Sequence, residues 1–261
     1  MTGWRAPYRH NETVSDSVSV TFAGSGDAFG SGGRYQACIH VRALGTGAVL
    51  LDCGATSLAA LKHAGLDPGE IETAFVSHLH GDHFGGLPFL ILDGQFSRRG
   101  EPLAIVGPPG TAGRLTDAME CLFPGSAAVS RRFELRVTEL DPGSTRTVGG
   151  VTVSAWEADH PSGAAALLLR LQIAGKTIAY TGDTAWTDAI VSAAAHADLL
   201  IAEAYHWEKR VPYHLRHADL DAHRGRLTAR RVVLTHMSAD MLRHGSEAGF
   251  ELAHDGLVIS V

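Results

Sequence analysis

The sequence is poor in several features that would restrict what the protein can be. It has three cysteines among 261 residues, Cys38, Cys53 and Cys121, and none belongs to a CxxC pair. Neither a disulfide framework nor a thiolate zinc site is therefore indicated. No apolar run reaches the length of a transmembrane helix, and no apolar stretch follows the first basic residues as in a secretory signal. We expect a cytoplasmic protein that does not span a membrane.

The chain also lacks a basic stripe. It has 22 Lys and Arg against 28 Asp and Glu, which gives a formal net charge of −6. A protein that holds a long nucleic acid usually presents a basic surface, so the balance favours a small substrate over a long nucleic acid. Two bound divalent cations would nevertheless add positive charge locally.

No repeat, linker or low-complexity tract divides the chain. We predict one domain over residues 1–261, in which 1–16 form an extended N-terminal segment. Short β-branched or alternating apolar runs predict strands at 18–23, 37–44, 48–52, 73–77, 103–106, 133–139, 151–157, 165–173, 176–181, 199–202, 231–235 and 257–261. Helices are expected at 57–64, 87–98, 111–122, 187–195 and 218–228. Clusters of strands followed by helices indicate an α/β fold with mixed sheets covered by helices.

Histidine is what the sequence has in excess, with 15 in the chain. The densest group lies in SHLHGDHFGG, directly after the apolar segment TAFVS. His78 and His80 are two residues apart, so at a strand end their side chains point the same way. Gly81 lets the chain turn, and Asp82 and His83 can then address a second point. This density of ligand-type side chains suits two adjacent divalent ions better than one.

Three more ligand candidates each follow an apolar strand: His160 after VTVSAWEAD, Asp183 after KTIAYTG and His236 after RRVVLT. Loops at strand ends that share one edge of a sheet converge there. A lone histidine at a strand end is more often a cap or a surface residue, but beside HLHGDH we interpret all three as ligands. The remaining histidines, among them His40 and His254, are expected at the surface.

With these motifs the chain resembles the metallo-β-lactamase superfamily, and within it the ribonuclease Z-like branch, from about Val18 to Val261. HLHGDH is the superfamily's HxHxDH motif. VTFAGSGDAFGSGGR is similar to the glycine-rich first turn of the branch, LLDCG to its second strand and HFGGLPFLILDG to its first helix. YTGDT and LTHMS are similar to its later ligand motifs. The resemblance implies a four-layer αββα metallo-β-lactamase sandwich.

The resemblance also implies two divalent metal ions and a hydroxide that they generate to attack phosphorus. It assigns the ligands as His78, His80 and His160 on one ion, Asp82, His83 and His236 on the other, and Asp183 between them. Asp82 thereby counts as catalytic as well as metal-binding. Zinc suits this imidazole-rich set, and manganese or iron is also compatible with it.

The branch has an acidic residue in an EA[TY]-type segment, here Glu203 in AEAY, and then a histidine. Either His214 or His217 can be that histidine, and the spacing to His236 in the branch favours His214. This histidine would protonate the leaving oxygen, with Glu203 orienting its ring.

Two further residues of the first turn, Asp27 and Arg34, are weaker candidates for substrate contact. Ribonuclease Z carries a long arm that grips tRNA between the motifs matched by His160 and Asp183, whereas residues 161–182 here leave room for one hairpin. We therefore expect a phosphodiesterase that acts on a small phosphodiester or nucleotide-type substrate, and the resemblance is compatible with a homodimer.

Other functions stay open at this point. The same metals would serve the hydrolysis of a carboxylic ester, lactone, thioester or β-lactam. A ribonuclease Z-type endonuclease that matures the 3′ end of tRNA is the second alternative. A redox role would need a flavin partner, and a non-catalytic sensor would be expected to have lost ligands.

Overall fold

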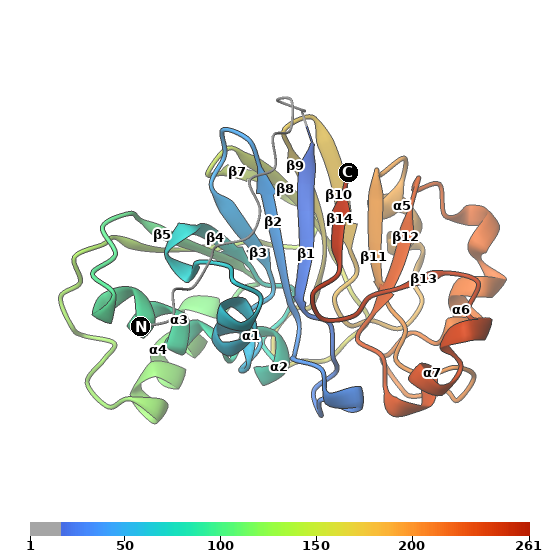
Figure 1. Cartoon of the computed structure of the whole chain (residues 1–261), viewed down its shortest axis with the longest axis horizontal. Coiled ribbons are helices and arrows are strands. Elements are labelled where there is room, and N and C mark those ends of the chain that lie inside the picture. Colours follow the sequence, from blue (N-terminus) through green and yellow to red (C-terminus); the bar gives the residue numbers. More distant parts are fainter. Residues whose placement is uncertain (1–16) are drawn as a thin grey trace, which may run out of the picture.

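The computed structural model describes residues 17–261, so the predicted segment 1–16 lies outside the described residues. Two seven-stranded sheets pack face to face, and helices cover their outer faces (Figure 1). The predicted four-layer α/β fold is confirmed. No helix within residues 17–261 is long and apolar enough to span a membrane.

The first sheet has the order β14-β1-β2-β3-β4-β5-β6. Its strands are β14 (Val258–Ser260), β1 (Val18–Gly24), β2 (Cys38–Ala43), β3 (Ala48–Leu51), β4 (Ile71–Phe75), β5 (Leu103–Gly107) and β6 (Leu135–Glu139). Pairing is antiparallel from β14 to β3 and parallel from β3 to β6.

The second sheet has the order β13-β12-β11-β10-β9-β8-β7. Its strands are β13 (Glu251–Leu252), β12 (Val232–Thr235), β11 (Leu199–Glu203), β10 (Lys176–Tyr180), β9 (Leu167–Ile173), β8 (Val151–Glu157) and β7 (Thr145–Val148). Strands β10 to β13 are parallel, and β9 pairs antiparallel with both β8 and β10. Strands β8, β10, β11 and β12 therefore all end at the same edge.

Helices of the first half of the chain cover the first sheet, and those of the second half cover the second sheet (Figure 1). They are α1 (Ser57–His63), α3 (Leu87–Phe96) and α4 (Thr111–Leu122) on one side, and α5 (Asp188–Ala194), α6 (His217–Ala222) and α7 (Ala239–Arg243) on the other. The one-turn helix α2 (Gly81–Phe84) lies inside the HLHGDH motif.

Alternation along the strands produces the layers. Val20 and Phe22 of β1 and Leu169 and Leu171 of β9 belong to the apolar layer between the sheets. Residues on the opposite face, such as Leu50 of β3, pack against the helices instead. Successive side chains of a strand point to opposite faces, so a sheet covered on both sides needs apolar residues at nearly every position.

Several expectations need correction. Strands β7 and β13 and helices α2 and α7 were not predicted, because such short segments show no clear period. The helix expected at 218–228 ends at Ala222, and a separate 3₁₀ turn follows at Arg224–Arg226. His40, expected at the surface, is only 4% exposed, because β2 is an interior strand of its sheet.

The interval between His160 and Asp183 contains the β9–β10 hairpin. Ala174 and Gly175 form its two-residue turn, with φ of 46° and 74°. Positive φ at both central residues is typical of a type I′ turn, which matches the twist of antiparallel strands. No long arm is inserted at this place.

Candidate metal centre

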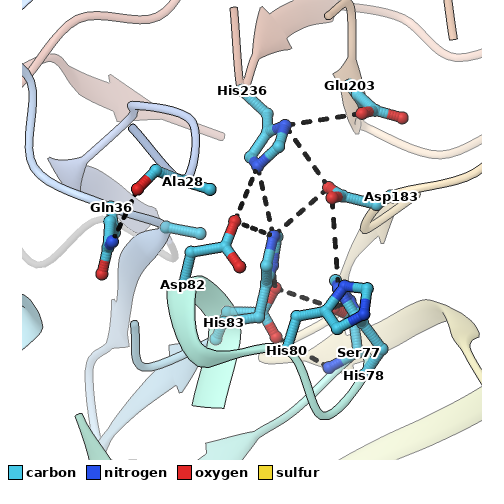
Figure 2. A network of polar contacts seen from close by, with 12 residues as sticks. Ala28, Gln36, Ser77, His78, His80, Asp82, His83, Asp183, Glu203 and His236 are labelled. Carbon is cyan, nitrogen blue, oxygen red and sulfur yellow. Dashed lines mark hydrogen bonds and ion pairs between the residues drawn. The ribbon is translucent and has the colours of Figure 1, made fainter. Parts of the chain in front are cut away.

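All seven predicted ligands gather where strands of the two sheets end, and Figure 2 labels those other than His160. The atoms of these seven residues form two groups, each with its members within 4.8 Å of one another, namely His78, His80 and His160, and Asp82, His83, Asp183 and His236. Asp183 and His236 also form a third such group with Glu203 and His214. The motif after β4 supplies four of these side chains, and the loops after β8, β10 and β12 supply one each. Residues far apart in sequence therefore meet because their strands end together.

Two glycines allow these loops to approach closely. A Cβ on Gly54 would lie 2.1 Å from the carbonyl oxygen of Asp82, so only glycine fits beside the ligand motif. Gly182 has a φ of 54°, and a Cβ there would lie 2.7 Å from the Cβ of Ser77. Any side chain at either position would push the ligand loops apart.

The donor set fits divalent cations. His78 Nε2, Asp183 Oδ1 and His236 Nδ1 are buried and have no hydrogen-bond partner among the described residues. Such atoms are costly to bury, and coordination would satisfy them. His160 Nε2 lies 3.0 Å from His80 Nδ1 in the first group. In the second group, His236 Nε2 lies 3.2 Å from Asp82 Oδ2.

Coordination requires ionised carboxylates and neutral imidazoles. Burial lowers the pKa of His83 and of His236, but the charge of Asp183 and the other carboxylates beside them outweighs it and raises the pKa, that of His236 to about 10, so these two rings would release a proton when a cation binds. Burial raises the pKa of Asp183, but the nearby charges of His236 and His83 outweigh it and hold the pKa well below its usual range. Burial lowers the pKa of His78 well below its usual value, so this ring is neutral at pH 7.

Asp52 orients the predicted ligand His83, and the sequence analysis did not single it out. Its carboxylate accepts hydrogen bonds from His83 Nδ1 at 2.6 Å, the Tyr180 hydroxyl at 2.7 Å and the Ser77 hydroxyl at 2.8 Å. A bond at Nδ1 turns Nε2 of His83 towards the cluster and makes it a better ligand. The only available signal was an acidic residue at the end of the apolar run in LLDCG.

His214 and Glu203 are in contact beside this cluster. His214 Nδ1 donates a hydrogen bond to Glu203 Oε1, and Glu203 Oε2 accepts from the backbone N–H groups of Thr184 and Leu215. Burial lowers the pKa of His214, but the hydrogen bond and the charge of Glu203 together raise it above the usual value. His214 Nε2 is left as the nitrogen that can serve a substrate.

His217, the other candidate, is placed differently. Its Nε2 donates to the carbonyl oxygen of Ala248 at 2.7 Å, and its ring stacks on Trp207 with centroids 3.9 Å apart. It belongs to none of the groups of ligand-type side chains around the cluster. These contacts tie the start of α6 to Trp207 before it and to Ala248 after it.

A cavity of about 380 Å³ opens over the cluster. The first turn reaches this cavity through Ala28 and Phe29, and the side chain of Phe29 is 83% exposed. The weaker candidates do not line it. Asp27 accepts hydrogen bonds from the backbone and hydroxyl of Ser31, and Arg34 donates to the carbonyl oxygen of Ala253. Both side chains thus hold the turn in shape.

The fold and this cluster define a metallo-β-lactamase-fold protein of the ribonuclease Z-like branch, a class of metal-dependent hydrolases. The chain belongs to the family described as anti-Pycsar protein Apyc1, whose family model matches residues 18–256.

Relatives and solved structures agree with this placement. The chain is 27% identical to ribonuclease Z of Methanosarcina acetivorans, over 85% of this chain and 88% of the relative. It is 27% identical to ribonuclease Z of Shouchella clausii, over 90% and 92%. The structure is similar to human tRNase Z, short form, with a TM-score of 0.76 at 27% identity, covering 93% of this chain and 99% of the other. A diphosphatase of the PhnP family, at 20% identity and a TM-score of 0.73 over 94% and 97%, shows the shared fold alone.

Proposed function

We propose that the protein is a phosphodiesterase that hydrolyses a small phosphodiester or nucleotide-type substrate with two divalent metal ions, zinc being the first candidate. The observation that carries the proposal is the pair of His214 and Glu203 beside a cluster that offers seven ligands. An imidazole held by a buried carboxylate is a suitable general acid for an alkoxide leaving group.

The ligands would divide along the two geometric groups, except for Asp183, whose Oδ1 lies 3.3 Å from His83 Nε2 and whose Oδ2 lies 4.0 Å from His78 Nε2. His78, His80 and His160 would hold one ion, and Asp82, His83 and His236 the other, with Asp183 shared. When bound, the ions acidify a water molecule and neutralise charge that builds on the phosphoryl oxygens. Imidazole-rich sets favour zinc, although manganese or iron is compatible with the same side chains.

Residues of the chain itself account for orientation and proton transfer. Asp52 fixes the ring of His83, and the carbonyl oxygen of Tyr213 accepts from His160 Nδ1 at 2.9 Å, which directs Nε2 of that ring to the cluster. His214, with Nδ1 on Glu203, would give the proton on Nε2 to the leaving oxygen. The negative charge of Glu203 stabilises the protonated ring until that step.

Substrate size follows from what surrounds the cluster. Residues 161–182 form a hairpin in place of a tRNA-gripping arm, and the formal net charge is −6. Both favour a small phosphodiester over precursor tRNA. The names of the relatives keep a ribonuclease Z activity as the second candidate.

A substrate panel tests the proposal. The zinc-loaded protein should hydrolyse bis(p-nitrophenyl) phosphate faster than a lactone, a thioester or the β-lactam nitrocefin. Asp183→Ala, with its ligand removed, should lose this turnover. Turnover of a carbonyl substrate with an inert phosphodiester would instead establish the alternative hydrolase.

A further inference from the structure

A second cavity adjoins the first at His214. It encloses about 630 Å³ and is lined by residues of α6, of the loops before α5 and before α6, and of the loop after β8, among them Asp159, Trp186, Arg210, Tyr213, His214 and His223. His214 lines both this cavity and the one over the metal cluster. Every other residue of the second cavity lies outside the lining of the first.

The walls of this second cavity combine two aromatic side chains, Trp186 and Tyr213, with charged groups. Trp186 is half-buried and stacks on His223, with centroids 4.0 Å apart and planes 12° from parallel. The side chain of Tyr213 is 47% exposed. Asp159 and Arg210 are exposed and offer an acceptor and a donor. A flat ring with polar edges is the kind of group that such walls favour.

The segment between the two cavities is held in place from both sides. Tyr213 has a φ of 66°, a conformation that non-glycine residues seldom adopt. Its carbonyl oxygen accepts from His160 Nδ1, and the next residue, His214, donates to Glu203. The wall of the second cavity is therefore tied to the metal cluster.

We propose that this second cavity is the leaving-group subsite and that it receives the nucleoside end of the substrate. The inference rests on the proposed function. In hydrolysis a water oxygen forms a new bond to phosphorus, the opposite ester P–O bond breaks, and His214 Nε2 gives its proton to the departing oxygen. His214 then regains a proton from solvent. The departing alcohol must lie on the side of His214, where the second cavity opens.

Thymidine 5′-(methyl phosphate) tests the proposal by internal competition. Release of thymidine places the nucleoside in the leaving-group subsite, whereas release of methanol places it elsewhere. Both leaving groups are primary alkoxides without a 2′-hydroxyl nearby, so chemistry alone favours neither strongly. Stacking of a base on aromatic side chains corresponds to roughly a 5- to 100-fold preference. We expect the wild-type protein to release thymidine over methanol by a factor in that range.

Two variants should abolish this preference. Trp186→Ala removes the stacking ring. Tyr213→Asn removes the exposed ring and keeps a residue that tolerates positive φ. Each should move the product ratio towards unity, and because the two products compete within one substrate, this ratio does not depend on the overall rate. Phe96→Ala, which truncates an aromatic residue 82% exposed on α3, is the matched control and should keep the wild-type ratio.

Calorimetric titration with thymidine gives a readout that is independent of turnover. The wild-type protein should bind thymidine about 5- to 100-fold more tightly than Trp186→Ala. A product ratio near unity in the wild type, or a ratio and an affinity unchanged in both variants, overturns the subsite. If no phosphodiester is cleaved at all, the proposed function has failed, and the titration alone decides whether the cavity binds a nucleoside.

Discussion

Removal of the His214 imidazole should slow hydrolysis by an amount that depends on the leaving group. General acid catalysis is worth about 10²–10⁴ in rate, and this gain matters for an alkoxide, which departs poorly without a proton. A nitrophenolate departs nearly as well unprotonated. We therefore expect His214→Ala to lose about 10²–10⁴ in kcat with thymidine 5′-(methyl phosphate), and less than about tenfold with bis(p-nitrophenyl) phosphate.

The contacts of Glu203 dictate its matched variant. Its Oε2 accepts from the N–H groups of Thr184 and Leu215, so Glu203→Ala would leave two buried donors unpaired at about 1–3 kcal/mol each. Glu203→Gln keeps one oxygen as the acceptor for these two N–H groups and places an amide NH2 opposite His214 Nδ1, so it removes the charge and the acceptor that stabilise the imidazolium of His214. It should show the same leaving-group dependence more mildly.

The assay compares initial rates on the two esters, with metal content measured in each sample. His217→Ala is the control, because it loses the bond to Ala248 and should cost stability without any leaving-group dependence. Equal losses of His214→Ala on both substrates would refute the reasoning, as would wild-type rates on both. A leaving-group dependence found in His217→Ala instead would transfer the acid role to that residue.

Three further predictions concern other parts of the molecule. Precursor tRNA should be cleaved poorly compared with a small phosphodiester, and efficient release of a correct 3′ trailer would contradict the role given to the short hairpin at 161–182. Asp52→Asn should weaken zinc binding about 10- to 100-fold in a chelator competition. An amide has one acceptor oxygen, whereas the two oxygens of the Asp52 carboxylate accept from His83, Tyr180 and Ser77. Unchanged affinity would show that Asp52 does not orient His83. Burial lowers the pKa of His40 to about 4, below its value of about 6.5 in the unfolded chain. The neutral ring thus stabilises the fold above pH 6.5, and this contribution is lost as pH falls towards 4. Between pH 6.5 and pH 4, the free energy of unfolding measured in urea should fall by about 1–3 kcal/mol more for the wild type than for His40→Gln. An equal fall in both proteins would argue against this role of His40.

Sequence analysis singled out the seven proposed metal ligands, which the structure brings together, because their signal is local and dense. Four of them lie in one motif, and each of the other three follows an apolar strand, so the fold alone brings them together. Asp52 carries no comparable signal, since one acidic residue after an apolar run is common. Only the contact with His83, a residue 31 positions away, shows what it does.

Side-chain placement in loops was the least predictable part. Asp27 and Arg34 have the charges expected of substrate contacts, yet Asp27 accepts a hydrogen bond from Ser31 within the first turn and Arg34 donates to the distant carbonyl oxygen of Ala253. The cavity beyond His214 depends on loops around Trp186 and Tyr213 that meet through tertiary packing. No periodicity or spacing in the sequence indicates such a meeting.

The number of metal ions held by each chain tests the central claim most directly. Elemental analysis of the protein after saturation with zinc and removal of free metal should give close to two ions per chain. Asp183→Ala should lose much of both, because its carboxylate lies between the two groups of ligands. At most one ion per wild-type chain under saturating zinc would contradict the dinuclear centre.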